Sequence, residues 1–214
     1  SSEVWALNAD QPGQAFTLFQ PRLKDVLYYV NHANDLFYIQ TNKEAKNFKI
    51  MTCAEGKTSV NDWKEIVPHN DKILVQGFDV FKNYLAISER KNGLTQIHII
   101  NTTDKSSHYL AFDEPAYSAG VGYTPDFNSE VLRFNYTSLT TPSTVYDYHM
   151  GTKQKKLMKQ VEVIGTFKPG DYITERLYAT ATDGTKIPVS LVYKKGFMKD
   201  GNGPLLLYGY GSYG

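Results

Sequence analysis

Three glycines near the end of the chain have a spacing that could bind a phosphate. Gly209, Gly211 and Gly214 form G-x-G-x-x-G directly after the apolar residues 204–208. In dinucleotide-binding folds this spacing lets the backbone approach a pyrophosphate, which the N-terminus of the following helix then holds. The site also needs an acidic residue about 20 positions later for the ribose. The sequence contains neither that helix nor that residue, and two bulky tyrosines separate the glycines, so a nucleotide site is the weaker reading.

Nucleophilic catalysis would need a different pattern, G-x-S-x-G on a strand-to-helix turn. Ser212 lies nearest to it, but Tyr210 rather than glycine stands two positions earlier. Without a nucleophile elbow, this polypeptide alone is not expected to carry out nucleophilic catalysis. The five histidines lack metal-ligand spacing, and the single Cys53 is expected to pack as a small apolar residue. We therefore expect no metal and no cofactor.

The charge balance argues against nucleic-acid and membrane partners. The 23 Lys and Arg nearly cancel the 22 Asp and Glu, so the chain has no basic field for phosphates or anionic lipid. No run of about 18 apolar residues predicts a membrane-spanning helix. One unpaired cysteine fits a reducing compartment, so we expect a cytoplasmic location, with the periplasm as the alternative.

The elements before the glycine-rich end follow a repeat. Short aromatic or β-branched segments recur about every 48 residues, and each is followed by turn formers and a second such segment, which predicts hairpins. These pairs are residues 36–40 with 48–52, 84–88 with 95–99, and 132–136 with 145–149. Further strands fit before each pair at 26–30, 73–80 and 117–123, and after each pair at 63–67, 107–112 and 155–159.

This spacing is typical of propeller blades with four strands each. Residues 4–7 and 15–19 fit the last two strands of a preceding blade, so the pattern predicts about three and a half blades. A propeller removes its sheet edges only when its ring is complete. We therefore interpret the sequence as a fragment of a larger fold. A β-sandwich built from the same hairpins is the alternative.

The repeat stops after about residue 160. Residues 165–172 contain two glycines and a proline, which is typical of a linker. Strand-like residues 173–181 and 186–193 flank Asp183 and Gly184, a strong hairpin signal. The apolar run at 205–208 suits a strand buried on both faces. We therefore divide the chain into a propeller portion, residues 1–164, and the linker and start of a second domain, residues 165–214.

The end of the chain resembles the opening of the hydrolase domain in the prolyl oligopeptidase family of serine peptidases. The resemblance is carried by IPVSLVYKK and PLLLYGYGSYG, and it extends to RLKDVLYYVNH, TNKEAKNFKI, FDEPAY and SLTTPSTVYDY. Within this family, the sequence most resembles the oligopeptidase B branch. The resemblance implies a mainly β chain: half of a seven-bladed propeller, followed by the first strands of an α/β-hydrolase domain.

The same resemblance assigns a role to Tyr210. In the family the second tyrosine of YGYG helps form the oxyanion hole, where a phenol donates a hydrogen bond to the tetrahedral intermediate. The catalytic triad would lie beyond Gly214, and the partners would be short peptides and the remainder of the same protein. The resemblance also implies cleavage after Lys or Arg, with the propeller excluding large substrates. A non-catalytic propeller that binds a protein or peptide is the alternative function.

Overall fold

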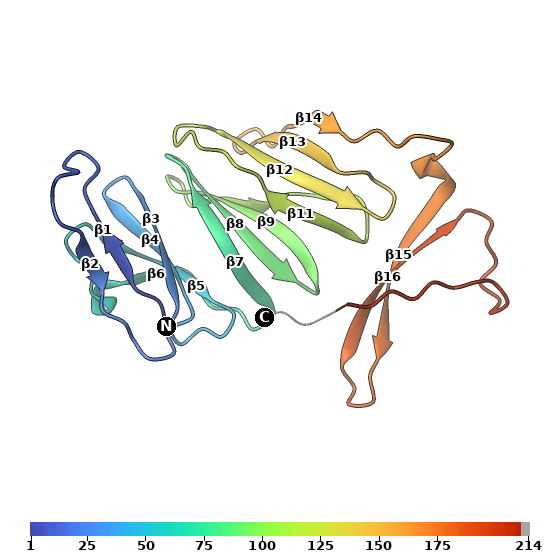
Figure 1. Cartoon of the computed structure of the whole chain (residues 1–214), viewed down its shortest axis with the longest axis horizontal. Helices are drawn as coiled ribbons and strands as arrows, with labels where there is room; N and C mark the ends of the chain where they lie inside the picture. The colour runs from blue at the N-terminus through green and yellow to red at the C-terminus, as the bar shows by residue number, and fades with distance from the viewer. Residues whose placement is uncertain (211–214) are drawn as a thin grey trace.

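The computed structural model describes residues 1–210 and consists mainly of antiparallel β-sheets. Figure 1 shows the sheets following one another in chain order. Three sheets have four strands each, paired in sequence order, and are called the first, second and third blades. The first blade contains β3 (Tyr28–Ala33), β4 (Leu36–Thr41), β5 (Lys49–Ala54) and β6 (Lys64–Val67). The second contains β7 (Ile73–Val80), β8 (Tyr84–Lys91), β9 (Leu94–Asn101) and β10 (Ser107–Tyr109). The third contains β11 (Tyr117–Val121), β12 (Val131–Ser138), β13 (Thr144–His149) and β14 (Lys155–Gln160). The prediction of a mainly β chain with blades of a partial propeller is confirmed.

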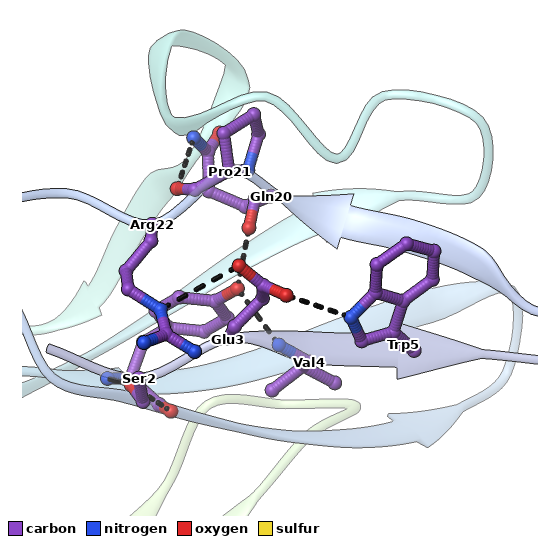
Figure 2. A network of polar contacts seen from close by, with 8 residues as sticks. Ser2, Glu3, Val4, Trp5, Gln20, Pro21 and Arg22 are labelled. Atoms are coloured by element: carbon purple, nitrogen blue, oxygen red, sulfur yellow. Dashed lines mark hydrogen bonds and ion pairs between the residues drawn. The ribbon is translucent and has the colours of Figure 1, made fainter.

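Before the first blade, β1 (Val4–Ala6) and β2 (Thr17–Gln20) form a two-stranded sheet, the half-blade. Polar contacts tie it to the first blade. The buried Tyr28 hydroxyl donates to the Gln20 carbonyl oxygen at 2.7 Å and accepts from the Val4 amide at 3.1 Å. Figure 2 shows the Glu3 carboxylate between two side chains of the same N-terminal region. Trp5 Nε1 donates to Glu3 Oε1 at 2.8 Å, and Arg22 Nε lies 3.5 Å from Glu3 Oε2.

The core lies between neighbouring sheets. Successive side chains of a strand point to opposite faces, so a strand with sheets on both sides needs apolar residues at consecutive positions. Strand β8 shows this arrangement: Leu85 and Ile87 belong to the cluster shared with the first blade, whereas Tyr84 and Ala86 belong to the cluster shared with the third. A third cluster joins the half-blade to the first blade around Phe19, Tyr28, Ile39, Cys53 and Trp63. The blades are therefore held together by the seams between them.

The chain leaves the third blade through residues 161–168. A short 3₁₀ turn, η2 (Pro169–Asp171), then leads into the hairpin of β15 (Tyr172–Thr180) and β16 (Lys186–Lys194), as predicted. Its turn is held by the Thr185 amide, which donates to Asp183 Oδ1 at 2.9 Å, and by Gly184 at φ 86°. A second 3₁₀ turn, η1 (Val60–Asp62), precedes β6. Within residues 1–210, no helix has the length and apolar composition needed to cross a bilayer. The division of the chain at residue 164 stays a prediction.

The expectation of a buried strand at residues 205–208 is wrong for this structure. These residues have no strand assignment, and Leu206 is 91% exposed. A strand buried on both faces needs paired neighbours and a layer against each face. Among the described residues no strand pairs with this segment, so its apolar side chains are left in solvent.

Candidate functional site

Tyr210 lies at the end of the described residues, in the extended segment that follows the hairpin. Its side chain is 73% exposed. Gly209 beside it has no atom within 4 Å of the position a Cβ would occupy, so the backbone there is open on that side. The other residues of the glycine-rich run, 211–214, lie outside the described residues. The oxyanion role of Tyr210 therefore stays a prediction.

A clamp of three side chains fixes the loop that leads to this segment. Lys199 Nζ contacts both carboxylate oxygens of Glu175, at 2.9 and 3.0 Å, and lies 4.8 Å from the centroid of the Tyr193 ring. The Tyr193 hydroxyl donates to the same carboxylate. Hydrogen bonds from Tyr193 and Lys199 lower the pKa of Glu175, so it stays ionised. The clamp could not be predicted from the sequence because its members are separated by up to 24 positions and follow no motif.

The loop closes on itself next to the clamp. A Cβ at Gly203 would lie 2.5 Å from Cζ of Phe197, a separation that real side chains do not tolerate. Glycine at 203 therefore lets the backbone pass the Phe197 ring immediately before Pro204. This close approach lies in the same loop as Lys199 of the clamp, immediately before the segment that carries Tyr210.

A second polar site lies on the propeller, between the second and third blades. Glu114 accepts four hydroxyl hydrogen bonds, from Ser138 and Thr140 at 2.6 Å, Tyr136 at 2.7 Å and Thr141 at 2.8 Å. Partial burial raises the pKa of Glu114, but the four donors together outweigh this and lower it. The carboxylate ties the β12–β13 turn to the segment that enters β11. Its lone pairs are all used, so we assign it a structural role.

A cavity of about 220 Å³ adjoins this carboxylate. Half of its lining residues are aromatic, and Lys155 Nζ lies 5.1 Å from the centroid of the Tyr146 ring. The lining residues are Phe112, Asp113, Glu114, Phe134, Tyr136, Thr141, Tyr146 and Lys155. Because a cation of the chain itself already lies over one ring, the cavity is a less suitable peptide site than its aromatic lining suggests.

Glu114→Gln is expected to lower the free energy of unfolding by about 1–3 kcal/mol at neutral pH, because the amide nitrogen cannot accept from the hydroxyls that face it. The lowered pKa of Glu114 gives this loss a pH dependence. The wild-type advantage is complete above the ordinary pKa of 4.5 and disappears as pH falls through the lowered pKa. Urea unfolding of both proteins between about pH 7 and pH 3 measures it; a pH-independent difference would contradict the assignment.

The remaining candidates are structural. Burial raises the pKa of Cys53 to about 11, so the thiol is protonated at neutral pH and packs in the core as predicted. His98 contacts Glu89 at 3.1 Å and stacks on Tyr109, and His108 contacts the Tyr148 hydroxyl at 2.9 Å. Within residues 1–210, no group of three His, Cys, Asp or Glu side chains is arranged to hold a metal ion.

Comparison with known proteins finds similarity to proteins that are named as peptidases. Residues 1–161 match the family described as prolyl oligopeptidase, N-terminal beta-propeller domain. The whole chain aligns at 44% identity with 30% of dipeptidyl aminopeptidase BI from Pseudoxanthomonas mexicana. It aligns at 32% identity, again over its full length, with 30% of protease 2 from Moraxella lacunata.

Solved structures give the same result for the fold. Oligopeptidase B from Trypanosoma brucei, with covalently bound antipain in a closed form, superposes with a TM-score of 0.78 at 32% identity, covering 86% of this chain and 27% of that one. Oligopeptidase B from Leishmania major superposes with a TM-score of 0.80 at 29% identity, covering 92% and 29%. The chain thus spans less than a third of the length of each of these relatives.

Proposed function

The chain belongs to the prolyl oligopeptidase family, and from this premise we propose that it is part of a serine peptidase that hydrolyses short peptides. The observation that carries the proposal is that the whole of this chain, including the residues after the propeller, aligns with two proteins named as peptidases. In this proposal Tyr210 donates one hydrogen bond to the oxyanion, and the nucleophile and its base come from residues after Gly214. Residues 165–214 would then begin the hydrolase domain.

For the substrate, we propose cleavage after Lys or Arg, with the propeller restricting the entry of large proteins. This proposal is supported by the likeness to protease 2 and to two oligopeptidase B structures. A second candidate activity is release of dipeptides from a free amino terminus. It is favoured by one observation, the 44% identity with a protein named dipeptidyl aminopeptidase.

Under this proposal the chain is part of a longer protein, which we call the full-length parent protein. One experiment on that protein separates these activities. A serine-directed phosphonate probe should label it, and an N-acylated peptide containing one internal arginine should be cleaved after that residue. A dipeptidyl aminopeptidase would instead require the free amine and would leave the acylated peptide intact, because the blocked end lacks the ammonium group it recognises. A parent protein that takes up no probe and cleaves neither the acylated peptide nor the same peptide with a free amino terminus would contradict the peptidase proposal and favour a non-catalytic binding propeller.

A further inference from the structure

Arg176 joins the hairpin to the second blade. From β15 its Nη2 donates to the backbone carbonyl oxygen of Asn92 at 2.6 Å, across 84 positions of sequence. Its Nη1 donates to Ser190 Oγ on β16 at 3.3 Å. One guanidinium, carried by β15, therefore contacts both the neighbouring strand β16 and the β8–β9 turn of the second blade. The planar fork of arginine suits such a bridge, because its donors point in fixed, diverging directions.

The β8–β9 turn has the shape needed to receive this side chain. Asn92 and Gly93 have φ values of 52° and 74°, the left-handed conformations of a tight hairpin turn. A Cβ at Gly93 would lie 2.9 Å from Arg176 Nη2 and 3.3 Å from Cγ of Pro188 on β16. The missing side chain thus makes room for groups from both strands of the hairpin. Gly56 has a similar φ of 72° but no atom within 4 Å of its Cβ position, so the close fit is particular to Gly93.

The hydrogen bonding of the Arg176 guanidinium is incomplete, which reduces what this contact contributes to the free energy of folding. Arg176 Nε is buried and has no hydrogen-bond partner among the described residues. The guanidinium also acts on Tyr117 of β11: burial raises the pKa of this phenol, and the Gln96 hydrogen bond and the Arg176 charge oppose the rise. Only Nε is enclosed in this way, because Arg176 as a whole is partly exposed, and its two terminal nitrogens make the hydrogen bonds that fix the geometry of the contact.

We propose that Arg176 and the Asn92–Gly93 turn form a latch that sets the angle between the hairpin and the propeller. The clamp of Glu175, Tyr193 and Lys199 fixes the loop after the hairpin, so the latch also orients the segment carrying Tyr210. Arg176 is a positioning residue in this scheme. Only this last consequence rests on the proposed function, under which the hairpin begins the catalytic domain.

The latch can be tested without any measurement of catalysis. In the full-length parent protein, spin labels at Lys46→Cys on the first blade and Thr182→Cys on the hairpin turn would report their separation by pulsed electron resonance. Both sites are exposed, whereas the native Cys53 is buried. We expect Arg176→Ala to raise the population of undocked distances about tenfold, the order that one hydrogen bond from a charged donor contributes. Arg133→Ala, which removes an exposed ion pair to Asp147 on the third blade, is the matched control and should not change the distribution.

Glycine variants provide the second arm. Gly93→Ala should broaden the distribution as Arg176→Ala does, whereas Gly56→Ala has the same backbone strain without a neighbour and should leave it unchanged. The double variant Arg176→Ala with Gly93→Ala should add nothing beyond either single change, because both remove one contact. Unchanged distances in both single variants, or fully additive effects, would overturn the latch. A parent protein that shows the latch but cleaves no peptide would overturn the proposed function alone.

If the parent is a peptidase, opening the latch should also alter kinetics. Arg176→Ala should lower kcat for a short peptide more than it raises KM, because the oxyanion donor is misplaced while substrate contacts persist. A variant that loses folded protein without this split would have only a structural defect, which would count against the positioning role.

Discussion

Tyr210→Phe in the full-length parent protein is expected to lower kcat for a short peptide by about 10²- to 10³-fold, with KM nearly unchanged. The phenol would donate to an oxygen that becomes fully negative only in the tetrahedral intermediate, so its removal raises the barrier and leaves ground-state binding intact. The phenyl ring remains, so packing is conserved. Steady-state kinetics on one N-acylated peptide measures the effect.

Tyr208→Phe is the matched control. Tyr208 lies two positions earlier in the same segment and is also largely exposed, at 85%. It should keep kcat within about threefold of wild type, since a surface hydroxyl without a partner in the transition state contributes little. Equal losses in both variants would mean that the segment as a whole supports catalysis. An unaffected Tyr210→Phe enzyme would remove Tyr210 from the proposed oxyanion hole.

The blades could be predicted from sequence because each one repeats the same physical pattern. Residues 84–88 contain consecutive apolar side chains, and β8 shows why: both of its faces are covered by neighbouring sheets. Strand ends were harder to predict. The strand expected at 26–30 is β3 (Tyr28–Ala33), because Leu27 donates its amide to the Asn42 side chain at 2.7 Å and Asp25 turns the chain with φ 61°.

Of the candidate site residues, the sequence proposed only Tyr210, through the resemblance of a short run of residues, and its role stays a prediction. The Arg176 contact spans 84 positions of sequence, and the contacts of Glu114 with Ser138 and of Glu175 with Lys199 each span 24. No local motif links these residues, and their types are common on surfaces. The strand expected at 205–208 failed for a related reason: hydrophobicity predicts burial, but burial requires neighbours that the described residues do not provide.

Phe134→Ala is expected to lower the free energy of unfolding by about 3–5 kcal/mol, the range for truncating a buried phenylalanine. Phe134 is 1% exposed in the seam between the second and third blades, where its ring lies 5.2 Å from that of Tyr146 and 5.9 Å from that of Phe112. It also lines the 220 Å³ cavity, so truncation would enlarge an existing void. Urea unfolding measures the loss. Leu157→Ala on the exposed β14, with a side chain 55% in solvent, should change stability by less than about 0.5 kcal/mol.

The location of the damage tests the seam description more strictly than its size. Each core cluster joins only two neighbouring sheets, so Phe134→Ala should speed amide exchange in β12 and β13 and spare β3 and β4, whose packing belongs to other clusters. Uniform acceleration across all three blades would show that the sheets unfold as one unit. In that case a contact with one blade, such as the Arg176 contact to the β8–β9 turn, would affect the stability of all three blades. Local acceleration would instead mean that each seam can yield separately, which is what a latch at one blade needs in order to set an angle.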